Sequence, residues 1–247
     1  MYGVAATTRI KANSTRAQST TTTAMIESDS LTTATAAVDI AKIANLLKRE
    51  RFHRDTAQWD LCRAAYHPNA SKTYINVAWY EGDIDGFLSR SAKVHQGKVN
   101  IIHTSFDPVS IHVNGHRAIS EAFCLVTSSL TLGGVDYELA SHMRLATRLE
   151  KSSDAAGQWH MLSLESTYVR DRLVSCFPGV NVGDSPLTMT EEVLAYPKSY
   201  RHLAFVMLNR GLAPRLDLPH EDDQESVRAV LDRNRVFLAG AEEIHKN

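Results

Sequence analysis

The sequence lacks the features that mark several classes of protein. Its 247 residues include only three cysteines, Cys62, Cys124 and Cys176, and no two of them have C-x-x-C spacing. This scarcity argues against a disulfide framework or a zinc knuckle and favours buried, unreactive thiols in a reducing compartment. No apolar run approaches the roughly 20 residues that a membrane-spanning helix needs. We therefore expect neither an integral membrane protein nor a membrane partner.

An excess of charge of one sign is also missing, as are the common cofactor motifs. Lysine and arginine number 27 and aspartate and glutamate 28, so the formal net charge of −1 argues against a protein built mainly to bind nucleic acid. No G-x-G-x-x-G, P-loop or G-x-S-x-G motif occurs in a fitting context, which argues against nucleotide cofactors and serine hydrolase chemistry. Among the 11 histidines, the pair His112 and His116 has no cysteine or carboxylate close by. We expect neither a metal nor another cofactor.

Residues 1–34 differ in composition from the rest of the chain. They are rich in Thr, Ser and Ala, and no acidic residue precedes Glu27, whereas three basic residues do: Arg9, Lys11 and Arg16. The stretch has too few apolar residues to fold alone, so we expect a disordered or targeting tail. Its composition also fits a transit peptide. We expect a cytoplasmic protein and keep organelle targeting, or a working start at Met25, as open alternatives.

The first part of the folded chain has helical periodicity. Helices are expected over 36–52, 56–66 and 84–92, because apolar residues recur there at helical spacing. Asp55 or Thr56 has a suitable side chain to cap the second of these helices at its N-terminus. The chain therefore begins with three helices.

The middle of the chain has the patterns of strands. One strand is expected over 73–80, between the second and third helices, and Glu81-Gly82-Asp83 should end it. Asn114-Gly115 is a strong signal for a two-residue hairpin turn, and Gly133-Gly134 marks another turn. The five strands expected after the helices cover 99–105, 109–113, 117–130, 135–150 and 159–173. Three helices followed by a meander of antiparallel strands predict an α+β fold.

The residues beyond these strands predict a helical extension. A loop with glycine and proline over 178–186 precedes two expected helices, over 199–209 and 226–239. We therefore divide the rest of the chain into a domain over 35–178 and an extension over 179–247. The helices of the extension carry apolar stripes that must be buried somewhere. They could pack across the main domain as a lid, or on a second subunit as a dimer contact.

Four motifs stand at the joints between the expected elements. In chain order they are Arg54-Asp55-Thr56-Ala57-Gln58-Trp59-Asp60; Tyr80-Glu81-Gly82; Ile102-His103-Thr104 with Ile111-His112-Val113-Asn114-Gly115-His116-Arg117-Ala118; and Ser141-His142-Met143-Arg144 with Arg148-Leu149-Glu150 and Gly157-Gln158-Trp159. Their order and intervals over 38–178 resemble the SnoaL-like branch of the nuclear-transport-factor-2-like (NTF2-like) superfamily. The resemblance implies a curved antiparallel sheet wrapped by helices into a cone, with a pocket inside. It does not choose a reaction, because members include scytalone dehydratase, a dehydrochlorinase, steroid isomerases, epoxide hydrolases, polyketide cyclases and proteins without known activity.

The same resemblance singles out Asp55 and His103 as a catalytic pair. Asp55 stands where scytalone dehydratase and the dehydrochlorinase keep a catalytic aspartate, and His103 lies on the strand that holds its partner histidine. A carboxylate on Nδ1–H would fix the imidazole tautomer, so that Nε2 could remove a proton next to a carbonyl. Without the family, Asp55 could be a helix cap and His103 a buried core residue. Scytalone itself fits poorly as a substrate, because Arg54 replaces the dehydratase's tyrosine and no second pocket histidine matches.

Five other residues are predicted to line the pocket. Trp79 and Tyr80 could stack on a flat substrate, or belong to an aromatic core. Arg144 could pair with a carboxylate or phenolate, although a solvated outer face would suit it equally. Tyr168 and Arg170 are two residues apart and are expected on one face of a strand, where the phenol could polarise a carbonyl oxygen or simply satisfy the backbone.

These observations predict a cofactor-independent lyase, isomerase or cyclase. His103 would act as base and then as acid, Asp55 would orient it, and Arg144 or Tyr168 would stabilise the enolate oxygen. The expected substrate is a small apolar carbonyl compound of polyketide, terpenoid or aromatic type, in secondary metabolism, and the expected assembly is a homodimer or small homo-oligomer. The alternative is a non-catalytic ligand-binding or scaffold protein, with His103 sealed in the core. An epoxide hydrolase would need a second carboxylate, for which no position matches.

Overall fold

The computed structural model describes residues 34–95, 97, 99–105, 108, 110–154, 156–177 and 187–240. The predicted tail over 1–34 lies outside this part of the chain except for its last residue, and the predicted loop over 178–186 lies wholly outside it. Val109, at which a strand is predicted to begin, is also outside it. No helix in the described ranges has the length and apolar character needed to cross a bilayer.

Three helices begin the described chain, as the apolar periodicity predicts. They are α2 (Ala34–Asp55), α3 (Trp59–Ala64) and α4 (Ile84–His95). The predicted cap is wrong, because Gln58 is the N-cap of α3 and Asp55 is the last residue of α2. Helix α2 extends beyond residue 52, and the chain then reverses through Ala57, which has a φ of 57°. This reversal directs the Asp55 carboxylate at the sheet instead of at α3.

One sheet contains the eight described strands. They are β1 (Tyr74–Val77), β2 (Tyr80–Gly82), β3 (Ile101–Ser105), β4 (Ser110–Asn114), β5 (Arg117–Leu132), β6 (Val135–Lys151), β7 (Trp159–Met161) and β8 (Ser163–Ser175). The order across the sheet is β2-β1-β8-β6-β5-β3, with β4 beside β5 and β7 beside β6. Neighbouring strands are antiparallel except β1 and β8. The predicted α+β fold is confirmed.

Two of the predicted strands are interrupted. The stretch 73–80 divides into β1 and β2 at a turn formed by Ala78 and Trp79, and β2 ends at Gly82, within the predicted break at Glu81-Gly82-Asp83. The stretch 159–173 divides into β7 and β8 at Leu162. Neither interruption contains glycine or proline, so the sequence carries no turn signal at these points.

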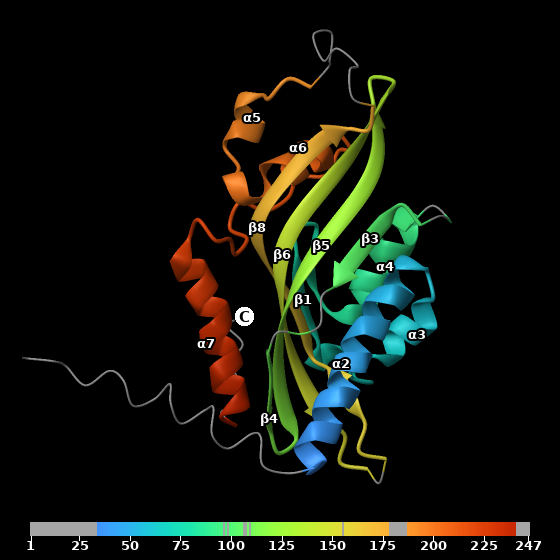
Figure 1. Ribbon diagram of the computed structural model, residues 1–247, viewed down its shortest axis with the longest axis vertical. Coiled ribbons are helices and arrows are strands. Elements are labelled where there is room, and N and C mark those ends of the chain that lie inside the picture. The colour runs from blue at the N-terminus through green and yellow to red at the C-terminus, as the bar shows by residue number, and fades with distance from the viewer. Residues whose placement is uncertain are drawn as a thin grey trace, which may run out of the picture.

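The long strands β5, β6 and β8 bend, which gives the sheet a concave and a convex face (Figure 1). Helices α2, α3 and α4 lie to one side of these strands and α7 lies to the other (Figure 1). The main apolar core forms between the first three helices and the sheet, and its fully buried members include Ile43, Ile75, Phe87 and Leu149. Because alternate residues of a strand point to opposite faces, the register decides which side chains reach the concave face.

The C-terminal extension covers both faces of the sheet. It contains the short helix α5 (Glu191–Leu194), the 3-10 turn η3 (Lys198–Tyr200), α6 (Arg201–Leu208) and α7 (Gln224–Leu238). Helix α6 packs on β6 and β8, where Phe205 and Val206 join Leu139 in a separate apolar cluster. Helix α7 packs on β4, β5 and β6 and buries Val227 and Val230. The chain's own sheet therefore buries the apolar stripes of both helices, and α6 lies where a lid would lie.

Candidate active site

A cavity of about 160 Å³ lies between the helices and the concave face of the sheet. Its floor consists of alternate residues of four strands, as the register requires: Ile101 and His103 from β3, Val126 and Ser128 from β5, Leu139, Ser141, Met143 and Leu145 from β6, and Ser166 and Tyr168 from β8. An apolar cavity of comparable volume can accommodate a single aromatic ring. The cavity therefore suits a compact, mainly apolar ligand.

The walls and roof of this cavity come from elements on both sides of the predicted domain boundary. Arg51 and Arg54 of α2 and Phe87 of α4 form part of the walls. The roof is supplied by the extension: Leu203, Val206 and Met207 of α6, with Arg210 and Leu212 just after it. The sequence of the extension is compatible with a lid or with a dimer contact, and this packing places α6 over the cavity of its own chain.

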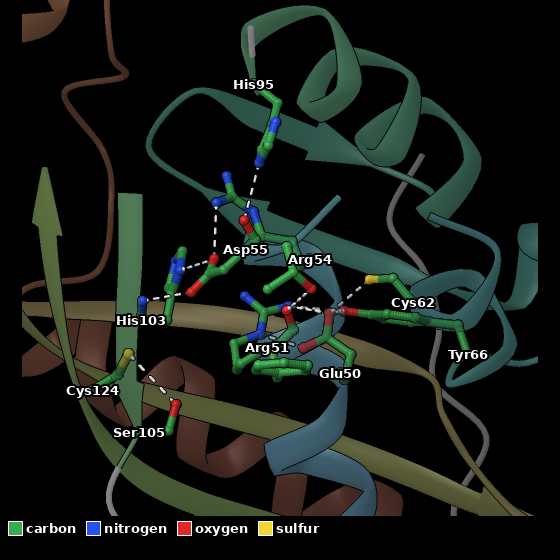
Figure 2. Close-up of polar contacts among 12 residues, drawn as sticks. Glu50, Arg51, Arg54, Asp55, Cys62, Tyr66, His95, His103, Ser105 and Cys124 are labelled. Atoms are coloured by element: carbon green, nitrogen blue, oxygen red, sulfur yellow. Dashed lines mark hydrogen bonds and ion pairs between the residues drawn. The ribbon is translucent and has the colours of Figure 1, made fainter. Parts of the chain in front are cut away.

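Asp55 and His103 are in direct contact beside this cavity. The Asp55 Oδ1 atom lies 2.7 Å from the His103 Nδ1 atom, and Asp55 Oδ2 accepts the His103 backbone N–H at 2.6 Å (Figure 2). An ionised carboxylate can only accept hydrogen bonds, so Nδ1 carries the proton and Nε2 is the basic nitrogen. The last residue of α2 thus fixes both the position of β3 and the tautomer of its histidine.

Burial and hydrogen bonding set the charge state of this pair. Burial alone would raise the pKa of Asp55, but the hydrogen bonds and charge of His103, with the charge of Arg54, hold that pKa below its usual value. Burial is the largest influence on His103, and it lowers the pKa of that imidazole despite the opposing hydrogen bond to Asp55. At neutral pH the pair therefore consists of a carboxylate and a neutral imidazole, the form that can accept a proton.

Arg54 is a site residue that the sequence analysis noted only as a departure from the family. Its Nη1 donates to Asp55 Oδ1 at 3.2 Å, so Arg54 and His103 share one carboxylate oxygen (Figure 2). The side chain lines the cavity, and its buried Nε–H has no hydrogen-bond partner among the described residues. A basic residue adjacent to Asp55 on the same helix was the available signal.

A second pair of charges lies one turn earlier on α2. The Arg51 guanidinium donates two hydrogen bonds to the Glu50 carboxylate, which also accepts from the Tyr66 hydroxyl at 2.9 Å. Cys62 Sγ lies 3.5 Å from the same carboxylate, and burial raises the pKa of this thiol (Figure 2). Arg51 is thereby matched by a carboxylate of its own, whereas Arg54 is not.

Trp79 and Tyr168 line the cavity, as predicted, and Tyr80 does not. The Trp79 ring stacks on Phe87 with 5.1 Å between ring centroids. The Tyr168 hydroxyl accepts the backbone N–H of Ala78 at 2.8 Å, so it holds the turn between β1 and β2, and burial raises its pKa. Tyr80 instead packs in the core, where its hydroxyl donates to the carbonyl of Asp83. The turn at 78–79 separates the two neighbouring aromatic side chains.

The predictions that Arg144 and Arg170 line the pocket are wrong. Met143 and Leu145 point into the cavity, so Arg144 between them points to the convex face. There it donates to Glu121 at 2.9 Å and to Glu221 at 2.8 Å. A register shift at His142 and Met143 pairs Met143 with Tyr168 but His142 with Arg170. This irregularity puts Tyr168 and the exposed Arg170 on opposite faces although they are two residues apart.

Metal-ligand geometry is missing from the described part of the chain. No group of three or more His, Cys, Asp or Glu side chains is placed there to hold a metal ion. No Asp or Glu is among the described residues that line the cavity, so the two-carboxylate arrangement of an epoxide hydrolase does not form around it. The chemistry available inside the cavity is that of an imidazole, three guanidinium groups and several hydroxyls.

Comparisons with known proteins agree with this architecture. Residues 35–165 match the SnoaL-like domain family. Pea pathogenicity protein 2 of Fusarium vanettenii is 23% identical over 187 residues, which cover 74% of this chain and 76% of that protein.

Two solved structures are similar in fold. One is a Novosphingobium aromaticivorans protein provisionally named a scytalone dehydratase, with 15% identity, a TM-score of 0.46 and coverage of 56% of this chain and 89% of that one. The other is an NTF2-like superfamily protein from Salmonella enterica serovar Typhimurium, with 15% identity, a TM-score of 0.43 and coverage of 59% and 96%. The family match extends over more than half of the sequence, and the chain belongs to the SnoaL-like domain family.

Proposed function

We propose that this protein is a cofactor-independent lyase or isomerase that moves a proton on a small, mainly apolar carbonyl compound. The observation that carries the proposal is the 2.7 Å contact between Asp55 and His103 beside an apolar cavity that His103 lines. The alternative, a non-catalytic binding or scaffold protein, requires His103 to be sealed in the core. A cavity that reaches His103 favours the enzyme.

The proposed reaction starts with His103 as general base. Nε2 removes a proton from the carbon next to the carbonyl, and the C–H electron pair forms a C=C bond while the carbonyl π pair moves to oxygen. The product is an enolate beside an imidazolium that Asp55 stabilises. Loss of a β-hydroxyl with proton return from His103 gives dehydration, and protonation at another carbon gives isomerisation. Attack of the enolate carbon on a second carbonyl gives ring closure.

Arg54 takes the role that the sequence analysis gave to Arg144 or Tyr168. Arg144 faces the convex side of the sheet, and the Tyr168 hydroxyl is held against the turn between β1 and β2 by the backbone N–H of Ala78. Arg54 lines the cavity next to His103, and its Nε–H could donate to the enolate oxygen. A preorganised donor at the atom where negative charge develops often contributes more than any other group to the rate of such reactions.

The charges of the site remain balanced through this step. Glu50, Arg51, Arg54 and Asp55 contribute two negative and two positive charges, and His103 is neutral before the reaction. Proton transfer creates one cation and one anion together. The imidazolium then pairs with Asp55 and the enolate with Arg54, so neither new charge is left unmatched in the buried site.

The finer predictions rest on the sequence alone and are part of this proposal. They are a polyketide, terpenoid or aromatic substrate in secondary metabolism, a cytoplasmic location and a homodimer or small homo-oligomer. The apolar lining and the volume of about 160 Å³ support a compact substrate that contains a ring.

Deuterium exchange tests the first chemical step without knowledge of the substrate. 2-Indanone and 2-tetralone in D₂O should exchange the protons next to the carbonyl faster in the presence of the protein, as measured by proton NMR. His103→Ala should abolish the enhancement, whereas His142→Ala, which removes a histidine from the convex face, should leave it unchanged. Equal enhancement by the wild-type protein and His103→Ala would overturn the proposal.

A further inference from the structure

Two serine hydroxyls in the cavity lack hydrogen-bond partners. Ser128 and Ser141 line the cavity and are only 7% and 1% exposed, yet neither Oγ atom has a partner among the described residues. Buried hydroxyls are almost always paired, because an unpaired one loses its hydrogen bonds to water without replacement. The absence of partners for two buried hydroxyls on the same cavity floor therefore requires an explanation.

Another buried serine of the same sheet, Ser163, is paired. Ser163 is fully buried on β8, and its Oγ accepts the backbone N–H of Arg148 at 3.1 Å and the Nε–H of the same residue at 3.0 Å. The sheet can therefore satisfy a buried serine where no ligand is involved. Ser128 and Ser141 differ from Ser163 in that they face the cavity.

The strand register brings the two hydroxyls together. Val126 pairs with Ser141, and Ser128 pairs with Leu139, so the serines are diagonal neighbours on β5 and β6. His103 on β3 pairs with Val126, which places Ser141 two strands, or about 10 Å, away from His103. Ser128 pairs with Ile101 on the same strand and is therefore a diagonal neighbour of His103, so the two serines and the proposed base lie on adjoining parts of the cavity floor.

The surroundings of the pair favour a neutral ligand atom. The neighbouring floor residues Ile101, Val126 and Leu139 are apolar. Asp171, which pairs with Ser141 on the next strand, already accepts hydrogen bonds from His202 and the backbone of Leu203. A hydroxyl or carbonyl oxygen can exchange hydrogen bonds with both serines without bringing a charge among these apolar residues.

We propose that Ser128 and Ser141 bind an uncharged oxygen of the ligand other than the carbonyl oxygen on which His103 and Arg54 act. This subsite narrows the substrate class to ring compounds that carry a carbonyl next to the acidic carbon and a hydroxyl or carbonyl as a second polar group. The distinction between the two oxygens rests on the proposed function, while the binding contact itself does not.

A pair of isosteric probes tests the contact by binding alone. 2-Naphthol and 2-methylnaphthalene differ by a hydroxyl in place of a methyl group, and their fluorescence reports binding to the full-length protein. The wild-type protein should prefer 2-naphthol by about tenfold or more. The double variant Ser128→Ala/Ser141→Ala should lose this preference to within about twofold. His103→Ala should retain it, which separates the serine contact from any contact of the phenol with the proposed base.

The melting temperatures of serine-to-alanine variants provide a second measurement, and two further serines provide matched controls. Ser128→Ala/Ser141→Ala should leave the melting temperature unchanged or raise it, because it removes two unpaired buried hydroxyls. Ser163→Ala should lower the melting temperature and keep the preference. Ser91→Ala removes a buried hydroxyl on α4 that has no partner among the described residues and does not line the cavity, so it should likewise leave the melting temperature unchanged or raise it, but it should keep the preference.

The outcomes distinguish this inference from the proposed function. Preference for 2-naphthol that survives in the double serine variant, equal affinity of the wild-type protein for both probes, or no binding of 2-naphthol at millimolar concentration would overturn the subsite. Loss of preference in the double variant without deuterium exchange by the wild-type protein would support the subsite and contradict the proposed function.

Discussion

Arginines on the two sides of the sheet differ in how completely they are paired with carboxylates. On the convex face, Arg144 donates to two carboxylates, Glu121 and Glu221. On the cavity side, Arg54 is more deeply buried, but it shares its carboxylate with His103 and keeps an Nε–H without a partner among the described residues. Packing alone favours matched charges, so an incompletely matched arginine beside a histidine is the stronger sign of a functional site.

Among substitutions that compare the cavity side with the convex face, Asp55→Asn should have the largest effect on the exchange rate. Asp55→Asn keeps the side-chain shape but removes the charge that stabilises the imidazolium and fixes its tautomer, so deuterium exchange should fall by about 10³-fold or more. Glu121→Gln, which removes a carboxylate from the convex face, should leave the exchange rate within about twofold of wild type. Near-normal exchange by a folded Asp55→Asn protein would reduce Asp55 to a structural link between α2 and β3.

Substitution of the two arginines should have opposite effects on activity and stability. Arg54→Met should lower the exchange rate about 10²-fold, because it removes the donor to the enolate oxygen, and Arg54→Lys should recover part of the loss. Arg144→Met should leave exchange unchanged and lower the free energy of unfolding by about 1 kcal/mol, because Glu121 and Glu221 lose their shared partner. Exchange kinetics and urea unfolding measure the two quantities, and normal exchange by Arg54→Met would remove Arg54 from the mechanism.

The pH profile of exchange should report the buried histidine. The rate requires neutral His103, whose pKa is lowered from 6.5 mainly by burial. Activity should therefore stay constant from alkaline pH down past 6.5 and fall about tenfold per pH unit only below the lowered pKa. The control is an NMR titration of His103 in Asp55→Asn, which does not depend on activity: the pKa-raising interaction with the carboxylate is lost there, so the imidazole should become protonated at a still lower pH. A wild-type decline that begins above pH 7 would contradict this electrostatic account.

The smallest effect is expected where α6 meets the sheet. His202 contacts the Asp171 carboxylate at 2.8 Å, and this hydrogen bond raises the pKa of His202 above 6.5. A raised pKa in the folded state stabilises the protein below the unfolded-state pKa, and the contribution is lost as the pH rises through the folded-state pKa. His202→Gln should therefore lower the melting temperature by more at pH 5.5 than at pH 8, as thermal unfolding would show. A difference that grows toward alkaline pH would contradict the assignment.

Much of the fold could be predicted from the sequence, because its elements are long and strongly patterned. Helices and strands with clear periodicity were predicted within a few residues, and the glycine-marked turn at Asn114-Gly115 joins β4 and β5. The short helix α5 has four residues, too few for periodicity to be visible. The turn at Ala78 and Trp79 contains neither glycine nor proline, so the sequence pattern predicts one continuous strand where the structure has two.

The site could be predicted only where a family motif exists. Asp55 and His103 were selected by the resemblance, and they lie in contact although 48 residues separate them. Which way Arg144 and Arg170 point depends on the register and on one irregularity between β6 and β8, and neither is encoded in local spacing. Ser128 and Ser141 resemble other strand serines in sequence, and only the absence of partners in the folded chain distinguishes them from Ser163.

The tautomer of His103 tests the central claim most directly, because a base must present an unprotonated nitrogen to the cavity. Long-range proton–nitrogen NMR spectra of ¹⁵N-histidine-labelled protein, assigned with His103→Gln, give the protonation of both ring nitrogens. We predict a proton on Nδ1 and an unprotonated Nε2 at pH 7, with Nε2 becoming protonated only below pH 6.5. A proton on Nε2 at neutral pH would contradict the account, because the nitrogen that should accept the substrate's proton would already hold one.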